Sequence, residues 1–221
     1  ETHHSVNYLE SHDDYTLGDF IRIGLGDVKS DKLITDPLEN ARLTPEQMQV
    51  NKLAALFLFT CQGPVMIHEG QEYGRSKVIA PTEVLDPNVG KIDHNSYEKD
   101  NETNWLNFDH AKMNRELIDY YRGLIRMRNN HAAFRTATPE QFTFFPVPDS
   151  LFLAYEIKHD TGRYIVLLNG NDFLTNKFIF PEGNWKILAD GIRADSKPFR
   201  LIQNRNILVP PGSGMVLIAE E

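Results

Sequence analysis

The hydrophobic pattern of the chain changes its period near Thr138. Before that point, apolar residues recur at helical spacing in two long segments, with short apolar runs outside them. After it, short runs of apolar and β-branched residues are separated by turn sequences rich in Gly, Asn and Pro. We therefore expect an α/β part over residues 1–137 and an all-β part over residues 138–221.

Two long helices are expected in the first part. Thr44 suits the cap of a helix that extends to about residue 62, because Pro45 fits the first helical position and Gln47 completes a capping box. A second, amphipathic helix is expected with Asp109 as its cap. Its apolar face consists of Leu117, Ile118, Tyr121, Leu124 and Ile125.

Strand-like runs at residues 6–9 and 65–67 each lead into a polar loop and then a helix, which gives two βα units. Two parallel strands cannot bury both faces of a sheet without neighbours. In a (β/α)₈ barrel, the polar residues after the strands carry the chemistry. We expect residues 1–137 to form the last two βα units, strands 7 and 8, of a (β/α)₈ TIM barrel in a chain that is cut mid-protein.

The second part is expected to form a C-terminal antiparallel β-sandwich. Its strands are predicted at residues 151–157, 164–168, 177–180, 185–189, 206–209 and 215–219.

Composition excludes several classes of partner. The net charge of −8 disfavours nucleic-acid binding, which needs clustered Lys and Arg. The sequence has no apolar run of the ~18 residues that a membrane-spanning helix needs. The single cysteine, Cys61, excludes an internal disulfide. We expect neither nucleic acid nor membrane among the partners.

The pair His12-Asp13 follows a predicted strand, where it suits an acid–base or carbohydrate site. Alone the pair is a weak signal, but its context is specific. The run VNYLESHD at residues 6–13, followed by YTL at 15–17 and by Asp19, resembles the fourth signature region of glycoside hydrolase family 13. The resemblance is closest to the pullulanase and debranching members of that family.

Downstream segments resemble the same family in the same order. QGPVMIHEGQEY at residues 62–73 is similar to its eighth-strand segment. RSK at 75–77, NSY at 95–97 and Asn104 are similar to its pullulanase loop. The resemblance covers about residues 6–135, and the predicted sandwich is similar to the family's usual C-terminal domain.

The resemblance implies a part in the retaining hydrolysis of α-1,6-glucosidic bonds in pullulan, amylopectin or glycogen dextrins. Such hydrolysis uses a carboxylate nucleophile and a carboxylic acid/base about 5 Å apart. The family carries both on strands four and five, which precede the part of the barrel found here. Asp13 matches its third carboxylate, which stabilises the oxocarbenium-like transition state, and His12 matches a histidine that binds the same sugar. The chain alone is therefore expected to be inactive.

The loop after residue 74 supplies further candidates, which are expected to bind substrate or to brace one another: Arg75, Asn95, Tyr97 and Asn104. Glu69 and Glu72 could replace the missing nucleophile and acid/base, but a structural role is favoured, because Glu72 matches a position that organises the loop in the family. A set of oxygen-bearing loop residues invites a calcium site, but its spacing does not match an EF-hand: Asp86, Asn88, Asp93 and Asp100. We expect no metal and no cofactor.

The expected partners are an α-glucan oligosaccharide or polysaccharide and the remainder of the catalytic barrel. Two departures from the family pattern stand out: Asp14 replaces the usual Asn, and Asn107-Phe108 replaces Asp-Trp. Two alternatives stay open. One is an isoamylase- or amylase-type member of the same family, although NSY at 95–97 favours the pullulanase type. The other is a non-catalytic glucan-binding or structural module.

Overall fold

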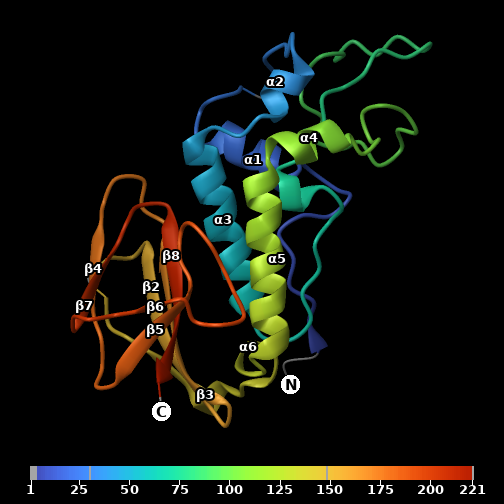
Figure 1. Cartoon of the computed structure of the whole chain (residues 1–221). Coiled ribbons are helices and arrows are strands. Elements are labelled where there is room, and N and C mark those ends of the chain that lie inside the picture. The colour runs from blue at the N-terminus through green and yellow to red at the C-terminus, as the bar shows by residue number, and fades with distance from the viewer. Residues whose placement is uncertain (1–3, 30, 148, 221) are drawn as a thin grey trace. The chain divides into compact units, whose positions relative to one another are not determined.

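The computed structural model describes residues 4–29, 31–147 and 149–220 (Figure 1). It divides into two compact units. The first comprises Glu1–Asn7, Lys52–Val65 and Asp119–Glu221, and the second comprises Tyr8–Asn51 and Met66–Ile118. The division falls within the helices α3 (Pro45–Thr60) and α5 (Arg115–Asn130). The sequence predicts a boundary at residue 137 between an α/β part and an all-β part. The two compact units do not test that boundary, so it stays a prediction.

The first unit contains an antiparallel sheet of six strands, drawn in yellow to red in Figure 1. Its strands, in spatial order, are β1 (Phe142–Phe144), β2 (Phe152–His159), β3 (Gly162–Asn169), β8 (Ser213–Glu220), β5 (Asn184–Ala189) and β6 (Arg200–Leu201). The strands β4 (Asn176–Ile179) and β7 (Asn206–Val209) form a separate antiparallel pair. This part of the chain is therefore an antiparallel β-rich domain, as the sequence predicts.

The two sheets share an apolar core. Phe178 of β4 and Val209 of β7 belong to one buried cluster with Trp185 of β5 and Leu167 of β3. The opposite face of the large sheet packs on helices of the same unit. Tyr164 of β3, for example, lies with its ring centre 5.2 Å from that of Phe134 in α6 (Ala133–Thr136). Each face of the sheet is thus covered, which explains the nearly continuous burial of β3.

The start of α3 follows the sequence prediction. The Thr44 hydroxyl accepts a hydrogen bond from the Gln47 N–H at 3.2 Å, and the Gln47 side-chain oxygen accepts one from the Thr44 N–H at 3.1 Å. This reciprocal pair satisfies two N–H groups that the first helical turn leaves without partners. The predicted capping box is confirmed.

The Thr44→Ala substitution is expected to lower the free energy of unfolding by about 1 kcal/mol, because it removes this cap. The midpoint of urea unfolding measures the effect. Thr175→Ala is a matched control, since Thr175 is exposed and lies outside helices and strands, and its effect should be within about 0.5 kcal/mol. Equal shifts in the two variants would contradict the capping role.

The predicted cap of the second helix is wrong. Asn107, not Asp109, caps α4 (Phe108–Met113), where its side chain accepts the Asp109 N–H at 2.9 Å. Asn114 ends that helix, and α5 follows directly. The Asn114 amide donates to the carbonyls of Ala41 and Tyr73, both at 2.8 Å. These long-range hydrogen bonds hold Asn114 outside a regular helix and so split the predicted element in two.

The two predicted strands of the first part are reduced to one parallel bridge between Asn7 and Val65. Parallel pairs depend on neighbouring strands and on covered faces, so this short pair forms no longer ladder among the described residues. The second unit is built from helices and loops: α1 (Leu17–Gly24), α2 (Pro37–Ala41), η2 (Gln71–Tyr73), α4 and the first residues of α3 and α5. Within the described residues, no helix combines the length and apolar character that crossing a membrane requires.

Candidate functional site

His12 and Asp13 lie in an exposed turn of the second unit. Their side chains are 70% and 63% exposed, and His12 Nε2 lies 3.4 Å from Asp13 Oδ1. The Ser11 hydroxyl accepts the Asp13 N–H at 3.3 Å. Asp14 has φ +60° and is the one non-glycine residue at positive φ among those described. Asn tolerates this left-handed conformation well, which explains physically why an Asn would suit position 14.

Glu10 anchors the N-terminal end of this turn. Its side chain is buried, and Oε2 accepts the Leu17 N–H at 2.9 Å while Oε1 lies 3.0 Å from Nδ1 of His68. The turn is therefore tied both to the start of α1 and to the segment after residue 67. Sequence reasoning did not select Glu10. The available signal is an acidic residue directly after a strand-like run, because a buried carboxylate needs partners.

Glu10→Ala is expected to lower the free energy of unfolding by about 2 kcal/mol, because it leaves the buried Leu17 N–H without a partner. Urea unfolding measures the change. Glu69→Ala is the matched control, since Glu69 is exposed, and it should shift stability by less than about 0.5 kcal/mol. Glu10→Gln should recover part of the loss, because its amide oxygen still accepts the N–H. Equal effects of the two alanine variants would contradict the proposed anchoring role of Glu10.

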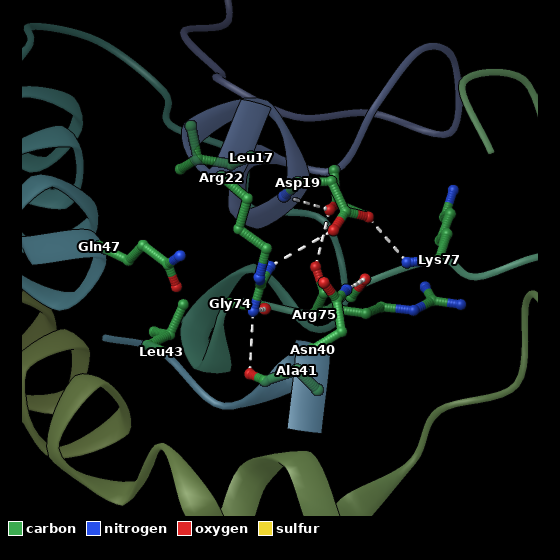
Figure 2. A network of polar contacts seen from close by, with 12 residues as sticks. Leu17, Asp19, Arg22, Asn40, Ala41, Leu43, Gln47, Gly74, Arg75 and Lys77 are labelled. Atoms are coloured by element: carbon green, nitrogen blue, oxygen red, sulfur yellow. Dashed lines mark hydrogen bonds and ion pairs between the residues drawn. The ribbon is translucent and has the colours of Figure 1, made fainter. Parts of the chain in front are cut away.

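Thr16 and Asp19 anchor the C-terminal end of the turn. Thr16 caps α1 by accepting the Asp19 N–H at 3.0 Å, and its hydroxyl donates to the Arg75 carbonyl at 2.7 Å. The fully buried Asp19 accepts the Lys77 N–H at 2.8 Å. Figure 2 shows Asp19 facing Lys77 and Arg22. The loop after residue 12 is thus bonded to the loop after residue 74.

Arg22 belongs to the same network of buried polar contacts as Asp19 (Figure 2). Its Nη1 lies 3.4 Å from Asp19 Oδ1, and its Nη2 donates to the carbonyls of Ala41 at 2.9 Å and Gly74 at 3.0 Å. Burial lowers the pKa of Arg22, and the adjacent Asp19 carboxylate opposes that effect. A Cβ on Gly18 would lie 2.7 Å from the Gly74 backbone, so only glycine permits this close approach.

Arg75 and Asn104 brace the long loop. The buried Arg75 guanidinium donates to the Asn104 carbonyl and to the Glu69 carbonyl. The Asn104 side chain accepts the Ser96 hydroxyl at 2.7 Å and donates to the Lys99 carbonyl at 2.6 Å. The Asn104 side chain thus bonds residues of its own loop, and the Arg75 side chain connects that loop to Glu69 before it. The geometry therefore favours the bracing alternative for Arg75 and Asn104.

Asn95 and Tyr97 are exposed on the same loop. The Tyr97 hydroxyl donates to Glu98 Oε1 at 2.9 Å. This hydrogen bond and the Glu98 charge raise the pKa of Tyr97, and the Asp13 carboxylate raises it further. Tyr97 therefore lies within electrostatic reach of Asp13. The structure brings His12, Asp13 and Tyr97 to one exposed region of the second unit.

Glu72 and the acidic loop residues have internal roles. The Glu72 carboxylate accepts the Gly70 N–H at 3.0 Å, which agrees with a loop-organising position. Asp86 and Asp93 both pair with the Lys99 ammonium, at 3.0 and 2.6 Å. In the part of the chain that the structure describes, no group of three or more His, Cys, Asp or Glu residues is arranged to hold a metal ion. That no cofactor is needed stays a prediction.

The fold is that of solved pullulanase structures. The pullulanase from Bacillus acidopullulyticus is 27% identical, with a TM-score of 0.72 over 96% of this chain and 24% of that protein. The Group B Streptococcus pullulanase SAP reaches a TM-score of 0.76 over 97% of this chain and 32% of its own, at 21% identity. The second likeness concerns the fold alone.

The chain is also similar to curated enzymes. The pullulanase of Bacillus subtilis is 31% identical over 135 residues, which cover 61% of this chain and 15% of that enzyme. The glycogen debranching enzyme of Dickeya chrysanthemi is 26% identical over 212 residues, 83% of this chain and 30% of the enzyme. No protein-family model matches the chain.

The chain is similar to pullulanases and glycogen debranching enzymes in both sequence and fold, and the resemblance found in the sequence is confirmed. It spans between 15% and 30% of the length of these two curated relatives.

Proposed function

We propose that this chain is the C-terminal part of an α-glucan debranching glycoside hydrolase of the pullulanase type. The parent enzyme hydrolyses α-1,6-glucosidic bonds in pullulan, amylopectin or glycogen dextrins with retention. The observation that carries this proposal is the exposed His12-Asp13 turn, held between two buried anchors in a chain homologous to such enzymes.

In this proposal, residues 1–137 supply strands 7 and 8 of a (β/α)₈ barrel, and residues 138–221 form the sandwich that follows. The parallel bridge between Asn7 and Val65 supports the pairing of these strands. Val6, Tyr8 and Met66 are exposed apolar side chains on the two strand segments. Further barrel strands would cover them, which makes the remainder of the barrel the first partner of this chain.

Asp13 is proposed to stabilise the positive charge that develops on the sugar ring. An ionised carboxylate fixed beside the ring favours the oxocarbenium-like transition state over the ground state. His12 is proposed to bind a hydroxyl of the same sugar. The nucleophile and the acid/base, about 5 Å apart in retaining enzymes, come from other strands of the barrel. The anchors at Glu10 and Asp19 fix where the Asp13 charge lies.

Asn95 and Tyr97 are proposed to contact further glucose units, because both are exposed on one loop and the Asp13 charge acts on Tyr97. Arg75 and Asn104 then act on substrate through the loop that they brace. The pullulanase from Anoxybacillus sp. LM18-11, whose fold this chain shares, has been solved with maltotetraose. That complex supports an α-glucan oligosaccharide as the ligand.

Linkage specificity tests the proposed function. The complete protein, consisting of this chain with its barrel, is incubated with pullulan and, separately, with amylose. We expect maltotriose from pullulan and no cleavage of amylose. Cleavage of amylose alone would support the amylase-type alternative. Binding of both glucans without any product would support a non-catalytic module.

A further inference from the structure

A cavity of about 460 Å³ lies within the second unit and has no part in the proposed chemistry of Asp13. Its walls come from three stretches of chain: the segment before α2, the loop after residue 75, and the segment that leads into α4. Much of the lining is aliphatic, including Ile34, Val78, Ile79 and Val89. The volume lies within the range of small-molecule sites.

Trp105 gives this cavity an aromatic surface. The side chain lines the cavity and is 60% exposed. The Trp105 N–H donates to the Asn101 carbonyl at 3.1 Å, which fixes the backbone that carries the ring. An exposed indole that lines a cavity offers a large apolar surface which a ligand can cover. The accessible face of the indole suits the C–H face of a ring-shaped ligand.

His110 gives the cavity a buried polar group. It lines the cavity, is 8% exposed, and its Nδ1 has no hydrogen-bond partner among the described residues. A buried polar atom of this kind is costly unless a partner satisfies it. Burial lowers the pKa of His110, as do the charges of Arg22 and Arg75, and this favours the neutral form of its ring. A neutral imidazole offers one donor and one acceptor, which a hydroxyl can match.

The remaining lining selects for a ligand that is amphipathic and uncharged. Glu102 and Arg75 both line the cavity and carry opposite charges, so neither an anion nor a cation is favoured overall. A purely aliphatic ligand would leave His110 unsatisfied. A pyranose has an apolar C–H face and a polar rim of hydroxyls, and it fits both parts of the lining.

We propose that this cavity binds a glucopyranosyl unit of an α-glucan, with the sugar face on Trp105 and a hydroxyl bonded to His110. The choice of glucose as the sugar rests on the proposed function. The site would hold a glucan chain at a place other than the His12-Asp13 turn and so raise the local concentration of substrate.

Maltose titrated into the 221-residue chain tests the site. Tryptophan fluorescence reports on Trp105, because the other tryptophan, Trp185, is buried in the sandwich core. We expect a saturable change with a dissociation constant of about 1–10 mM, the range of a small and shallow sugar site. No saturable change up to about 100 mM would overturn the proposal.

Variants locate the sugar, with binding measured by saturation-transfer NMR. Trp105→Ala is expected to weaken maltose binding by about tenfold or more, and Trp105→Phe by less. His110→Phe keeps the ring volume and should also weaken binding. Circular dichroism checks that each variant folds. Loss of binding in Tyr97→Ala, with binding retained in Trp105→Ala, would place the sugar on the loop near Asp13 and overturn the cavity assignment.

The two proposals fail separately. If the complete protein hydrolyses no α-glucan but maltose still binds through Trp105, the proposed function fails and the sugar site stands. Cellobiose, the β-linked control, should bind at least about fivefold more weakly than maltose. Equal binding of the two disaccharides would contradict the assignment to an α-glucan.

Discussion

Asp13→Asn should lower kcat for pullulan by about a thousandfold in the complete enzyme, with little change in KM. Asn keeps the size of the side chain and removes the charge, so it removes a stabilisation that exists mainly in the transition state. Because Asp13 is 63% exposed and carries no buried contact, the fold should be unaffected. Initial rates of reducing-end release measure the effect.

Asp14→Asn is the matched control for Asp13. It removes a neighbouring negative charge of the same turn, and Asn suits the backbone conformation at φ +60°. Its kcat should stay within about threefold of the wild type, because the proposal assigns the stabilisation of the transition state to the Asp13 charge alone. Equal losses in the two variants would show that only the net charge of the turn matters, which contradicts the role proposed for Asp13.

Asp19→Ala should lower the free energy of unfolding by about 3–5 kcal/mol, because it leaves the Arg22 charge buried without its carboxylate. Asp19 and Arg22 are both fully buried. The substitution also removes the acceptor of the Lys77 N–H, which connects the two site loops. Urea unfolding measures the loss.

Asp109→Ala is the matched control for Asp19. Asp109 also pairs with a basic residue three positions later, Lys112 at 2.7 Å, but both side chains are exposed. Solvent screens such a pair, so its removal should cost less than about 1 kcal/mol. A cost for Asp19→Ala no larger than that for Asp109→Ala would contradict the network in Figure 2.

Local signals in the sequence predicted much of the fold. The capping box at Thr44 and Gln47 was predicted correctly, because both partners lie within one helical turn. The long strands β2, β3 and β8 were predicted near their observed bounds, because turn sequences flank them. The short strands β1 and β6 were missed, since three and two residues carry no periodic pattern.

Long-range contacts account for what the sequence did not reveal about the site. The motif at residues 11–13 located His12 and Asp13. The Glu10–His68 contact joins residues 58 positions apart, and so does the bond from the Lys77 N–H to Asp19. No local pattern connects such partners, since they meet only through the tertiary fold. The cavity could not be predicted for the same reason, because its walls come from segments far apart in the sequence.

The most direct test of the proposed function compares this chain alone with the same chain joined to its barrel. Each protein is incubated with pullulan, and reducing ends are measured. We predict no release by the 221-residue chain alone, release by the joined protein, and loss of that release in Asp13→Asn. Turnover of pullulan by the chain alone, abolished by Asp13→Ala, would contradict the claim that Asp13 stabilises a reaction whose nucleophile lies elsewhere.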